Sequence, residues 1–299
     1  MAVEPVPKFV LPRDLAASRW RPVVRGALLV SVAYLALVAI AMLWEEAFIF
    51  FPLPYPGGVW NPPPGTEDAW FPAEDGTKLH GWFLPHPQPL AVILYCHGNA
   101  GNVTHRADVL WDFHRLAESS ILVFDYRGYG RSEGSPTEKG ILADTRAARR
   151  WLANRTGVSE NEIVLSGQSL GGAVAAVIAG QDGARALILE NTFTSIRDMA
   201  RYHYAWLPVW PVLRTKLDAL DHLKRYPGPV LVAHAERDSI VPLEHGRKLF
   251  AVAPRRKEFF LIPGADHNDP LPPGYYTKVK NFLVEIMGSS GADKADPPK

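Results

Sequence analysis

Residues 161–173 read Asn-Glu-Ile-Val-Leu-Ser-Gly-Gln-Ser-Leu-Gly-Gly-Ala, an apolar run that leads into the pattern Gly-x-Ser-x-Gly. Residues 163–165 are typical of a buried strand, and the small apolar residues 173–179 are typical of a buried helix. The pattern alone is weak evidence, but between such a strand and such a helix it predicts a nucleophile elbow. In this tight turn the two glycines leave room for the backbone, and the Ser169 hydroxyl points out above the sheet edge.

A serine hydroxyl becomes a nucleophile only when a base takes its proton, and a carboxylate must orient that base. In this architecture the three residues follow the chain order Ser, then Asp or Glu, then His, each in a loop after a strand. Asp238 follows a predicted strand at 229–235, and His267 follows a predicted strand at 259–263. The sequence therefore predicts Ser169 as the nucleophile, His267 as the base and Asp238 as the acid.

Three other residues could compete for the acid or base position. Glu236 lies too close to the end of its strand, and Asp221 lies in an amphipathic stretch that is typical of a solvated carboxylate. His245 begins a predicted helix, where we expect a surface histidine. None of the three displaces the assignment above.

Two backbone amides are expected to form an oxyanion hole, which needs N–H groups aimed at the charge on the substrate carbonyl oxygen. The strand predicted at 91–96 opens into His-Gly-Asn-Ala-Gly-Asn at 97–102, in the position of the loop after the third strand. We predict the amides of Asn99 and Leu170 as the donors. His97 precedes the nucleophile in the chain, and we expect it to brace this loop by hydrogen bonding.

Five segments carry a family resemblance. They are residues 96–102, 125–132, 167–172, 190–195 and 264–267, which read Cys-His-Gly-Asn-Ala-Gly-Asn, Asp-Tyr-Arg-Gly-Tyr-Gly-Arg-Ser, Gly-Gln-Ser-Leu-Gly-Gly, Glu-Asn-Thr-Phe-Thr-Ser and Gly-Ala-Asp-His. In these segments the chain resembles an α/β-hydrolase of the branch that includes bud-emergence-type proteins and membrane-associated protein depalmitoylases. The resemblance covers residues 66–287 and implies a serine hydrolase. It does not name the acyl group, because the branch contains esterases, thioesterases and uncharacterised members.

The residues leave two classes of function open. The set Ser169, Asp238 and His267 favours a serine hydrolase that forms an acyl-enzyme with a small-molecule or lipid-like ester or thioester of an apolar acid. The alternative is a catalytically silent α/β-hydrolase domain that binds a ligand. Amidases, peptidases and perhydrolases use the same residues, so the set does not separate them from esterases. Dehalogenation is disfavoured, because its nucleophile would be a carboxylate.

Composition is that of a globular protein with nearly balanced charge. The chain has 299 residues, 47% hydrophobic content and a formal net charge of +1, enough to bury one large core. Without a basic face with interleaved aromatic residues, nucleic acid is not an expected partner. Cys96 is the only cysteine, which excludes an internal disulfide and leaves no Cys/His cluster for a metal. We expect no cofactor, and the sequence makes no prediction of oligomeric state.

The amino terminus contains an uncharged apolar stretch at 26–44. As a helix it would span about 28 Å at ~1.5 Å per residue, which matches one bilayer crossing. Five basic residues precede it and two glutamates follow it: Lys8, Arg13, Arg19, Arg21, Arg25, Glu45 and Glu46. This bias predicts a single-pass anchor with a cytoplasmic amino terminus and an extracytoplasmic catalytic domain.

Three further features bear on the anchor and the compartment. Ala39-Ile40-Ala41 resembles a signal-peptidase site, but the apolar run continues past it, which favours an uncleaved anchor. Aromatic rings are expected at the membrane interface at Trp44, Phe48, Phe50 and Phe51. The sequon at 102–104 lies in the predicted oxyanion loop, where a glycan would obstruct the site. The sequon therefore favours a bacterial envelope over a glycosylating lumen.

These observations divide the chain into five parts. They are a basic cytoplasmic tail (1–25), a transmembrane anchor (26–46), a Pro-rich linker (47–65), an α/β-hydrolase domain (66–287) and a disordered tail (288–299). In the domain, a hairpin around Asp75-Gly76 precedes alternating helices and strands at 104–117, 120–126, 136–153 and 162–166. The third of these has Ser135 in the position of a helix cap. The alternation predicts a mainly parallel sheet with helices on both faces.

A short cap is expected between the predicted strand at 186–189 and the strand that precedes Asp238. Prolines interrupt its apolar residues, so we expect broken helices above Ser169. The apolar residues are Tyr202, Tyr204, Trp206, Trp210 and Leu213. The rings either line the substrate pocket, which would favour an apolar group, or pack on the core.

Overall fold

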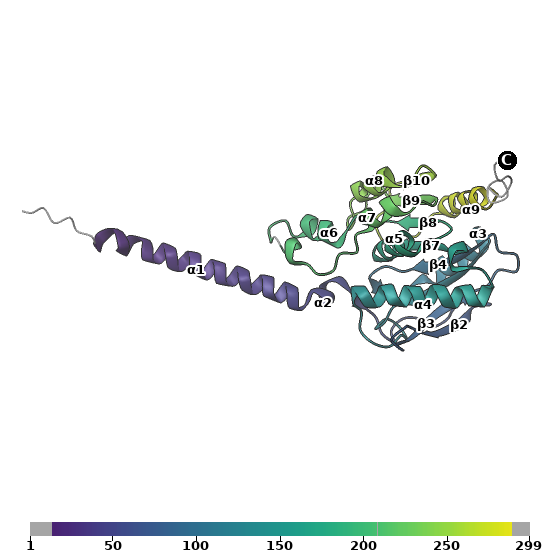
Figure 1. Cartoon of the computed structure of the whole chain (residues 1–299), viewed down its shortest axis with the longest axis horizontal. Helices are drawn as coiled ribbons and strands as arrows, with labels where there is room; N and C mark the ends of the chain where they lie inside the picture. Colours follow the sequence, from purple (N-terminus) through teal and green to yellow (C-terminus); the bar gives the residue numbers. More distant parts are fainter. Residues whose placement is uncertain (1–13, 208, 289–299) are drawn as a thin grey trace, which may run out of the picture. The chain divides into compact units, whose positions relative to one another are not determined.

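The computed structural model describes residues 14–207 and 209–288. Its contacts divide the chain into two units, Met1–Glu45 and Glu46–Lys299. In the first unit, helix α1 covers Asp14–Leu43, so the described part of the expected tail is helical (Figure 1). Its segment Trp20–Leu43 is long and apolar enough to cross a membrane. The segment is thus a candidate membrane anchor or signal sequence, and it contains all of the expected span except Trp44.

The second unit is built on a sheet of eight strands in the order β10-β9-β8-β7-β4-β6-β3-β2. The strands are β2 (Glu67–Pro72), β3 (Lys78–Leu84), β4 (Ala91–Cys96), β6 (Ser119–Asp125), β7 (Val164–Gln168), β8 (Leu187–Glu190), β9 (Val230–Ala235) and β10 (Lys257–Ile262). Neighbouring strands are parallel except at β3, which is antiparallel to β2 and β6. Every residue of β4 and β9 is buried, as expected of parallel strands covered on both faces. The expected hairpin and mainly parallel sheet are confirmed.

Helices cover both faces of this sheet (Figure 1). One hydrophobic cluster joins the sheet to α4 (Glu138–Thr156), α5 (Leu170–Asp182), α7 (Ala219–Arg225) and α8 (Leu243–Val252). A second cluster on the other face contains residues of α3 (Ala107–Leu116) and α9 (Pro273–Gly288). Residues 170–179 of α5 are all buried, which confirms the buried helix after the elbow. The expected disordered tail lies outside the described residues beyond Gly288.

The Pro-rich segment belongs to the second unit. Short strand β1 (Phe51–Pro52) follows α2 (Glu45–Ile49) and pairs in parallel with β5 (Ala100–Gly101), directly after β4. Phe50 is buried in the core of this unit, so its expected place at a membrane interface is wrong. The segment expected to be a linker is therefore docked on the domain through backbone hydrogen bonds. Its proline content does not predict this docking.

The cap is short and interrupted, as expected. It contains α6 (Ile196–His203) and the 3₁₀ turn η3 (Trp210–Val212). The Ile196 N–H donates to the carbonyl oxygen of Lys216 at 3.1 Å, so the cap leaves and returns to the domain at one place. Tyr202, Tyr204 and Trp206 are exposed, so for these three the alternative that they pack on the core is wrong. Trp210 and Leu213 are half-buried.

Helix α4 begins later than its predicted cap. Thr137, not Ser135, caps it, with its hydroxyl accepting from the Gly140 N–H at 3.0 Å. The carboxylate of Glu138 accepts from the N–H groups of Lys216 and Leu217 at 2.9 and 2.8 Å. Glu138 thereby fixes the end of the cap instead of completing a capping box.

Candidate active site

Ser169 lies at the expected elbow between β7 and α5. Its φ of 54° and ψ of −117° are strained for a residue with a side chain. A Cβ on Gly167 would lie 2.4 Å from the Gly171 carbonyl oxygen, and one on Gly171 would lie 1.9 Å from that of Cys96. Both positions therefore require glycine, as the motif implies. The Ser169 N–H donates to the Glu190 carbonyl oxygen at 2.8 Å, which ties the turn to β8.

Asp238 and His267 meet at the same edge of the sheet. Nδ1 of His267 lies 2.7 Å from Oδ2 of Asp238, whose side chain is fully buried. Oδ1 of Asp238 accepts from the N–H groups of Ile240 and Val241 at 3.0 and 2.7 Å. An ionised carboxylate only accepts hydrogen bonds, so Nδ1 of His267 carries the proton and Nε2 is free to accept one.

The backbone of His267 is also held from several sides. Its carbonyl oxygen accepts from Nδ2 of Asn191 at 3.0 Å and from Nε2 of Gln168 at 3.4 Å. Its N–H donates to Oδ1 of Asp266 at 2.7 Å, and the same oxygen accepts from the Ser239 N–H. These donors lower the pKa of Asp266, Ser239 first. Asp266 thus joins the loop that carries the acid to the loop that carries the base.

No hydrogen bond joins Ser169 Oγ to the His267 ring in the described part of the chain. Ser169 and His267 are both buried, and Gln168, next to the serine, donates to the His267 carbonyl oxygen at 3.4 Å. The structure therefore brings Asp238 and His267 together at the ends of β9 and β10, and it places Ser169 at the end of β7, which β8 separates from β9. Catalytic hydrogen bonds in substrate-free sites are often long and tighten only in the complex.

The Asn99 peptide is fixed on its carbonyl side. Its oxygen accepts from the Phe51 N–H at 2.9 Å and from the Tyr129 hydroxyl at 2.8 Å. Its side-chain amide donates to the Ile49 carbonyl oxygen at 3.1 Å. Leu170 is the first residue of α5, where an amide has no acceptor within the helix. Both expected oxyanion donors thus lie at the edge of the sheet that carries Ser169.

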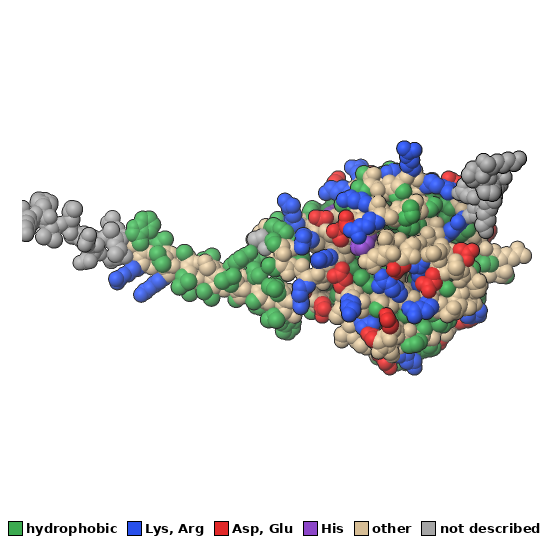
Figure 2. Space-filling view, in the orientation of Figure 1, with side chains coloured by type: hydrophobic (Ala, Val, Ile, Leu, Met, Phe, Trp, Pro, Cys, Tyr) green, Lys and Arg blue, Asp and Glu red, His purple; other side chains and the backbone are tan. Residues whose placement is uncertain are grey.

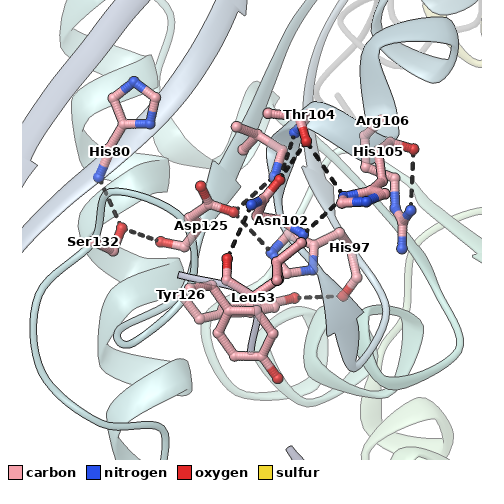
Figure 3. Close-up of polar contacts among 12 residues, drawn as sticks. Leu53, His80, His97, Asn102, Thr104, His105, Arg106, Asp125, Tyr126 and Ser132 are labelled. Atoms are coloured by element: carbon pink, nitrogen blue, oxygen red, sulfur yellow. Dashed lines mark hydrogen bonds and ion pairs between the residues drawn. The ribbon is translucent and has the colours of Figure 1, made fainter. Parts of the chain in front are cut away.

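A buried polar network lies beneath the oxyanion loop (Figure 3). Nδ1 of His97 lies 2.7 Å from the Gly98 carbonyl oxygen, which confirms the bracing role expected for this histidine. Nε2 of His97 lies 3.5 Å from Oδ1 of Asp125, and that oxygen accepts from the Val103 N–H at 2.8 Å. Both side chains are fully buried. Asp125 therefore has a structural role beneath this loop.

Asn102 anchors the other side of the same loop. Its side-chain amide donates to the carbonyl oxygens of Leu53 and Gly57 at 2.9 and 2.8 Å, and its oxygen accepts from Thr104. The residue is fully buried, so the folded protein has no room for a glycan there. A glycan at Asn102 would therefore be incompatible with this fold, and the bacterial envelope stays a prediction.

The competing residues have structural partners. Glu236 accepts from the Gly264 N–H at 2.8 Å, and Asp221 pairs with Arg225. His245 is buried and not on the surface as expected, with Nδ1 2.9 Å from Oγ1 of Thr194. Burial lowers its pKa and keeps it neutral. The position of His245 at the start of a helix did not reveal that this helix contacts Thr194, just before the cap.

Two buried ionisable residues near the site, His234 and Glu190, were given no role by the sequence. His234 lies 3.5 Å from Asp238, and burial lowers its pKa, so as a neutral ring it donates from Nε2 to the Val241 carbonyl oxygen. The Glu190 carboxyl accepts from the hydroxyls of Tyr95 and Tyr275. Burial outweighs these bonds and raises the pKa of Glu190. Burial likewise raises the pKa of the Cys96 thiol to about 12, which makes it a poor nucleophile.

The residues that the structure describes contain no group of three or more His, Cys, Asp and Glu residues that could hold a metal ion. Ser169, His267, Asp238 and the two amides are the reactive groups that this arrangement offers. These groups suit nucleophilic attack on an acyl carbon with an oxyanion held by backbone N–H donors.

Comparisons with known proteins agree with this fold. A family model described as the alpha/beta hydrolase fold matches residues 91–214. An uncharacterized protein of Mycobacterium tuberculosis is 38% identical over 248 residues, which cover 80% of this chain and 88% of that protein. Protein bem46 of Schizosaccharomyces pombe is 36% identical over 212 residues, covering 67% of this chain and 69% of that protein. The esterase Pf2001 of Pyrococcus furiosus has a TM-score of 0.65 at 19% identity, over 80% of this chain and 98% of that chain, a likeness of fold alone.

Proposed function

The chain belongs to the α/β-hydrolase family, and on that premise we propose that it is a membrane-anchored serine hydrolase of carboxylic esters or thioesters. One observation carries the proposal: the 2.7 Å contact between Asp238 and His267 lies at the strand ends beside the strained elbow of Ser169. A buried carboxylate that orients a histidine near such an elbow is what nucleophilic catalysis by serine requires.

In the proposed reaction, Ser169 Oγ attacks the acyl carbon while its proton passes to Nε2 of His267. The amides of Asn99 and Leu170 hold the negative charge on the carbonyl oxygen, and Asp238 stabilises the imidazolium. The carbon–oxygen or carbon–sulfur bond then breaks, and His267 gives the proton to the leaving alcohol or thiol. Water then attacks the acyl carbon while its proton passes to Nε2 of His267. The bond to Ser169 Oγ breaks, His267 returns the proton to Oγ, and the acid is released.

An apolar acyl group is the substrate feature that the cap and helix α1 support. Tyr202, Tyr204 and Trp206 present exposed rings on the cap, which follows a strand end at the active-site edge. A candidate anchor would keep the enzyme at a surface where lipid-like esters are abundant. We therefore propose a hydrophobic acid as the acyl part.

The test uses the full chain in detergent with p-nitrophenyl esters and thioesters of rising acyl length, and a fluorophosphonate probe. Ser169→Ala and His267→Ala should each lose on the order of 10⁴-fold or more in kcat, because the residues act as a unit. Ser159→Ala, at an exposed serine, is the matched control. Equal probe labelling of the wild type and Ser169→Ala would refute the nucleophile. Absence of any turnover or labelling would favour a catalytically silent binding domain, and turnover of anilides alone would favour an amidase.

A further inference from the structure

The half-buried side chain of Arg106 lies beside the nucleophile. Arg106 is the last residue of the 3₁₀ turn η1 (Val103–Arg106), directly after the oxyanion loop. A Cβ on Gly98 would lie 3.7 Å from Nη2 of Arg106 and 3.8 Å from Cβ of Ser169. The guanidinium and the serine therefore flank the same glycine, which places a positive charge at the edge of the candidate active site.

The donors of this guanidinium are largely unused. Nη1 donates to the His105 carbonyl oxygen at 3.1 Å (Figure 3). Nη2 lies 3.5 Å from the Ala100 carbonyl oxygen. Nε is buried and has no acceptor among the described residues, and no carboxylate there lies within 4.0 Å of the group. A guanidinium has five N–H donors. A buried donor without an acceptor costs free energy, and a ligand that supplies the acceptor removes that cost.

Glu190 is the candidate for an internal counter-ion, because the charge of Arg106 acts on it. The charge of Arg106 does act to lower the pKa of Glu190, but burial and the two tyrosine bonds have larger effects. The Glu190 carboxyl already accepts from Tyr95 and Tyr275 and forms no hydrogen bond with Arg106. Glu190 therefore leaves the N–H donors of Arg106 open.

The segment that carries Arg106 is fixed in place. The Asn102 side chain binds Leu53 and Gly57 on one side and caps η1 on the other. Asp125 holds the next residue, Val103, by its N–H at 2.8 Å. A guanidinium on such a fixed turn is positioned before substrate arrives, and it loses less freedom when it binds.

We propose that Arg106 binds an anionic group of the substrate, a carboxylate or a phosphate near the scissile carbonyl. The planar guanidinium can meet the two oxygens of such a group with parallel N–H bonds. The proposal rests on the proposed hydrolase function and narrows it to an amphiphilic ester or thioester with negative charge in its polar part. Arg106 is then a specificity-determining residue.

The kinetic test compares esters that differ only in charge. One pair places the charge on the acid, p-nitrophenyl hemisuccinate against its methyl ester. A second pair places it on the alcohol, 4-acetoxybenzoate against its methyl ester. In the full chain, Arg106→Gln should lower kcat/KM for the anionic member of the relevant pair about 10- to 100-fold more than for the neutral member. Arg106→Lys should retain part of the preference, and Arg115→Gln, at an exposed arginine on α3, should leave it unchanged.

A binding arm separates this proposal from the proposed function. In the Ser169→Ala background, phenyl phosphate and benzoate are titrated calorimetrically with and without Arg106→Gln. Weaker binding after the substitution supports the proposal even if no ester is turned over, and the two ligands distinguish phosphate from carboxylate. Equal losses for charged and neutral esters, or binding of neither anion by the parent, would overturn it. A loss of thermal stability that Glu190→Gln restores, with unchanged charge preference, would instead make Arg106 a counter-ion.

Discussion

At the scale of single residues, His267 is held at three atoms, and these contacts decide which of its nitrogens can act. Oδ2 of Asp238 contacts Nδ1, and Oδ1 of Asp266 accepts from the backbone N–H. Nδ2 of Asn191 donates to the carbonyl oxygen. Because all three contacts lie away from Nε2, that atom is left to face a reacting group. The orientation of the base is therefore a property of two loops joined by Asp266, not of the histidine alone.

Asp238→Asn is expected to keep the fold and lower kcat on the order of 10³- to 10⁴-fold. Oδ1 is occupied by the N–H groups of Ile240 and Val241, so an amide at this position would turn its NH₂ toward His267. Nδ1 would then accept, and Nε2 would carry the proton that it must be free to take. Steady-state kinetics and melting temperature check both parts. Glu236→Gln is the control, and wild-type kcat in Asp238→Asn would contradict the assignment.

Glu190 makes stability depend on pH. Burial raises its pKa in the folded protein above the unfolded value of about 4.3. Between these two pKa values the folded state keeps a proton that the unfolded state has lost. The stabilising contribution of Glu190 is therefore fully present below about pH 4.3 and is lost as the pH rises through the folded pKa. Glu190→Gln removes this titration. Its melting temperature relative to the wild type should therefore rise between pH 4 and pH 8. Glu74→Gln, at an exposed glutamate, is the control. A difference independent of pH would contradict the raised pKa.

At the scale of elements, β1 and β5 join the entry of the second unit to the oxyanion loop. The Phe51 N–H binds the carbonyl oxygen of Asn99, the residue whose own N–H is proposed to face the substrate. Leu53 makes the next contact, to Gly101 at 3.2 Å. A two-residue strand thus helps to set the direction of a proposed catalytic amide.

Phe51→Pro should lower kcat about 10-fold or more, because proline has no N–H to hold the Asn99 peptide. Phe51→Ala keeps that N–H and removes only an exposed ring, so its kcat should stay within about 2-fold of the wild type. Comparison of kcat with KM for a soluble ester separates loss of the oxyanion contact from loss of substrate binding. Equal activity of the two variants would show that β1 does not position Asn99.

Much of the fold could be predicted because its signals are local. β4 coincides with the predicted strand at 91–96, and the elbow, the hairpin and α5 follow from their own residues. The docking of 47–65, the burial of His245 and the position of Arg106 could not be predicted. Each depends on a residue distant in the chain, Asn99, Thr194 and Ser169 respectively, and no local pattern encodes such a neighbour.

At the scale of the whole molecule, the chain joins two units with different surfaces. From Trp20 to Leu43 the helix exposes apolar side chains, whereas the visible face of the second unit mixes acidic and basic residues (Figure 2). Apolar side chains exposed over a helix of this length are stable in lipid and not in water. The bias of basic residues before the helix supports a cytoplasmic amino terminus.

Protease added to intact bacterial spheroplasts that express the full chain should digest the second unit. Amino-terminal sequencing of the membrane fraction should find the leader attached. Replacing Glu45 and Glu46 by lysine, together with removal of the basic residues before the helix, should reduce digestion, because the charge bias sets the orientation. Protection of the wild-type domain would reverse the proposed topology, and a mature terminus at Met42 would identify a cleaved signal peptide.

The closed base of the cap makes it an exchangeable part. Residues 196 and 216 are joined by one backbone hydrogen bond, and Thr194 and Leu220 by another at 3.0 Å. The cap is therefore an insertion whose two ends are held together. Loop length between fixed ends has little influence on stability. A segment of different length or composition can therefore be grafted between residues 196 and 216 while β8 and β9 keep their register. Descendants of this chain could acquire new substrates by replacing the cap alone, while they keep the proposed catalytic residues unchanged.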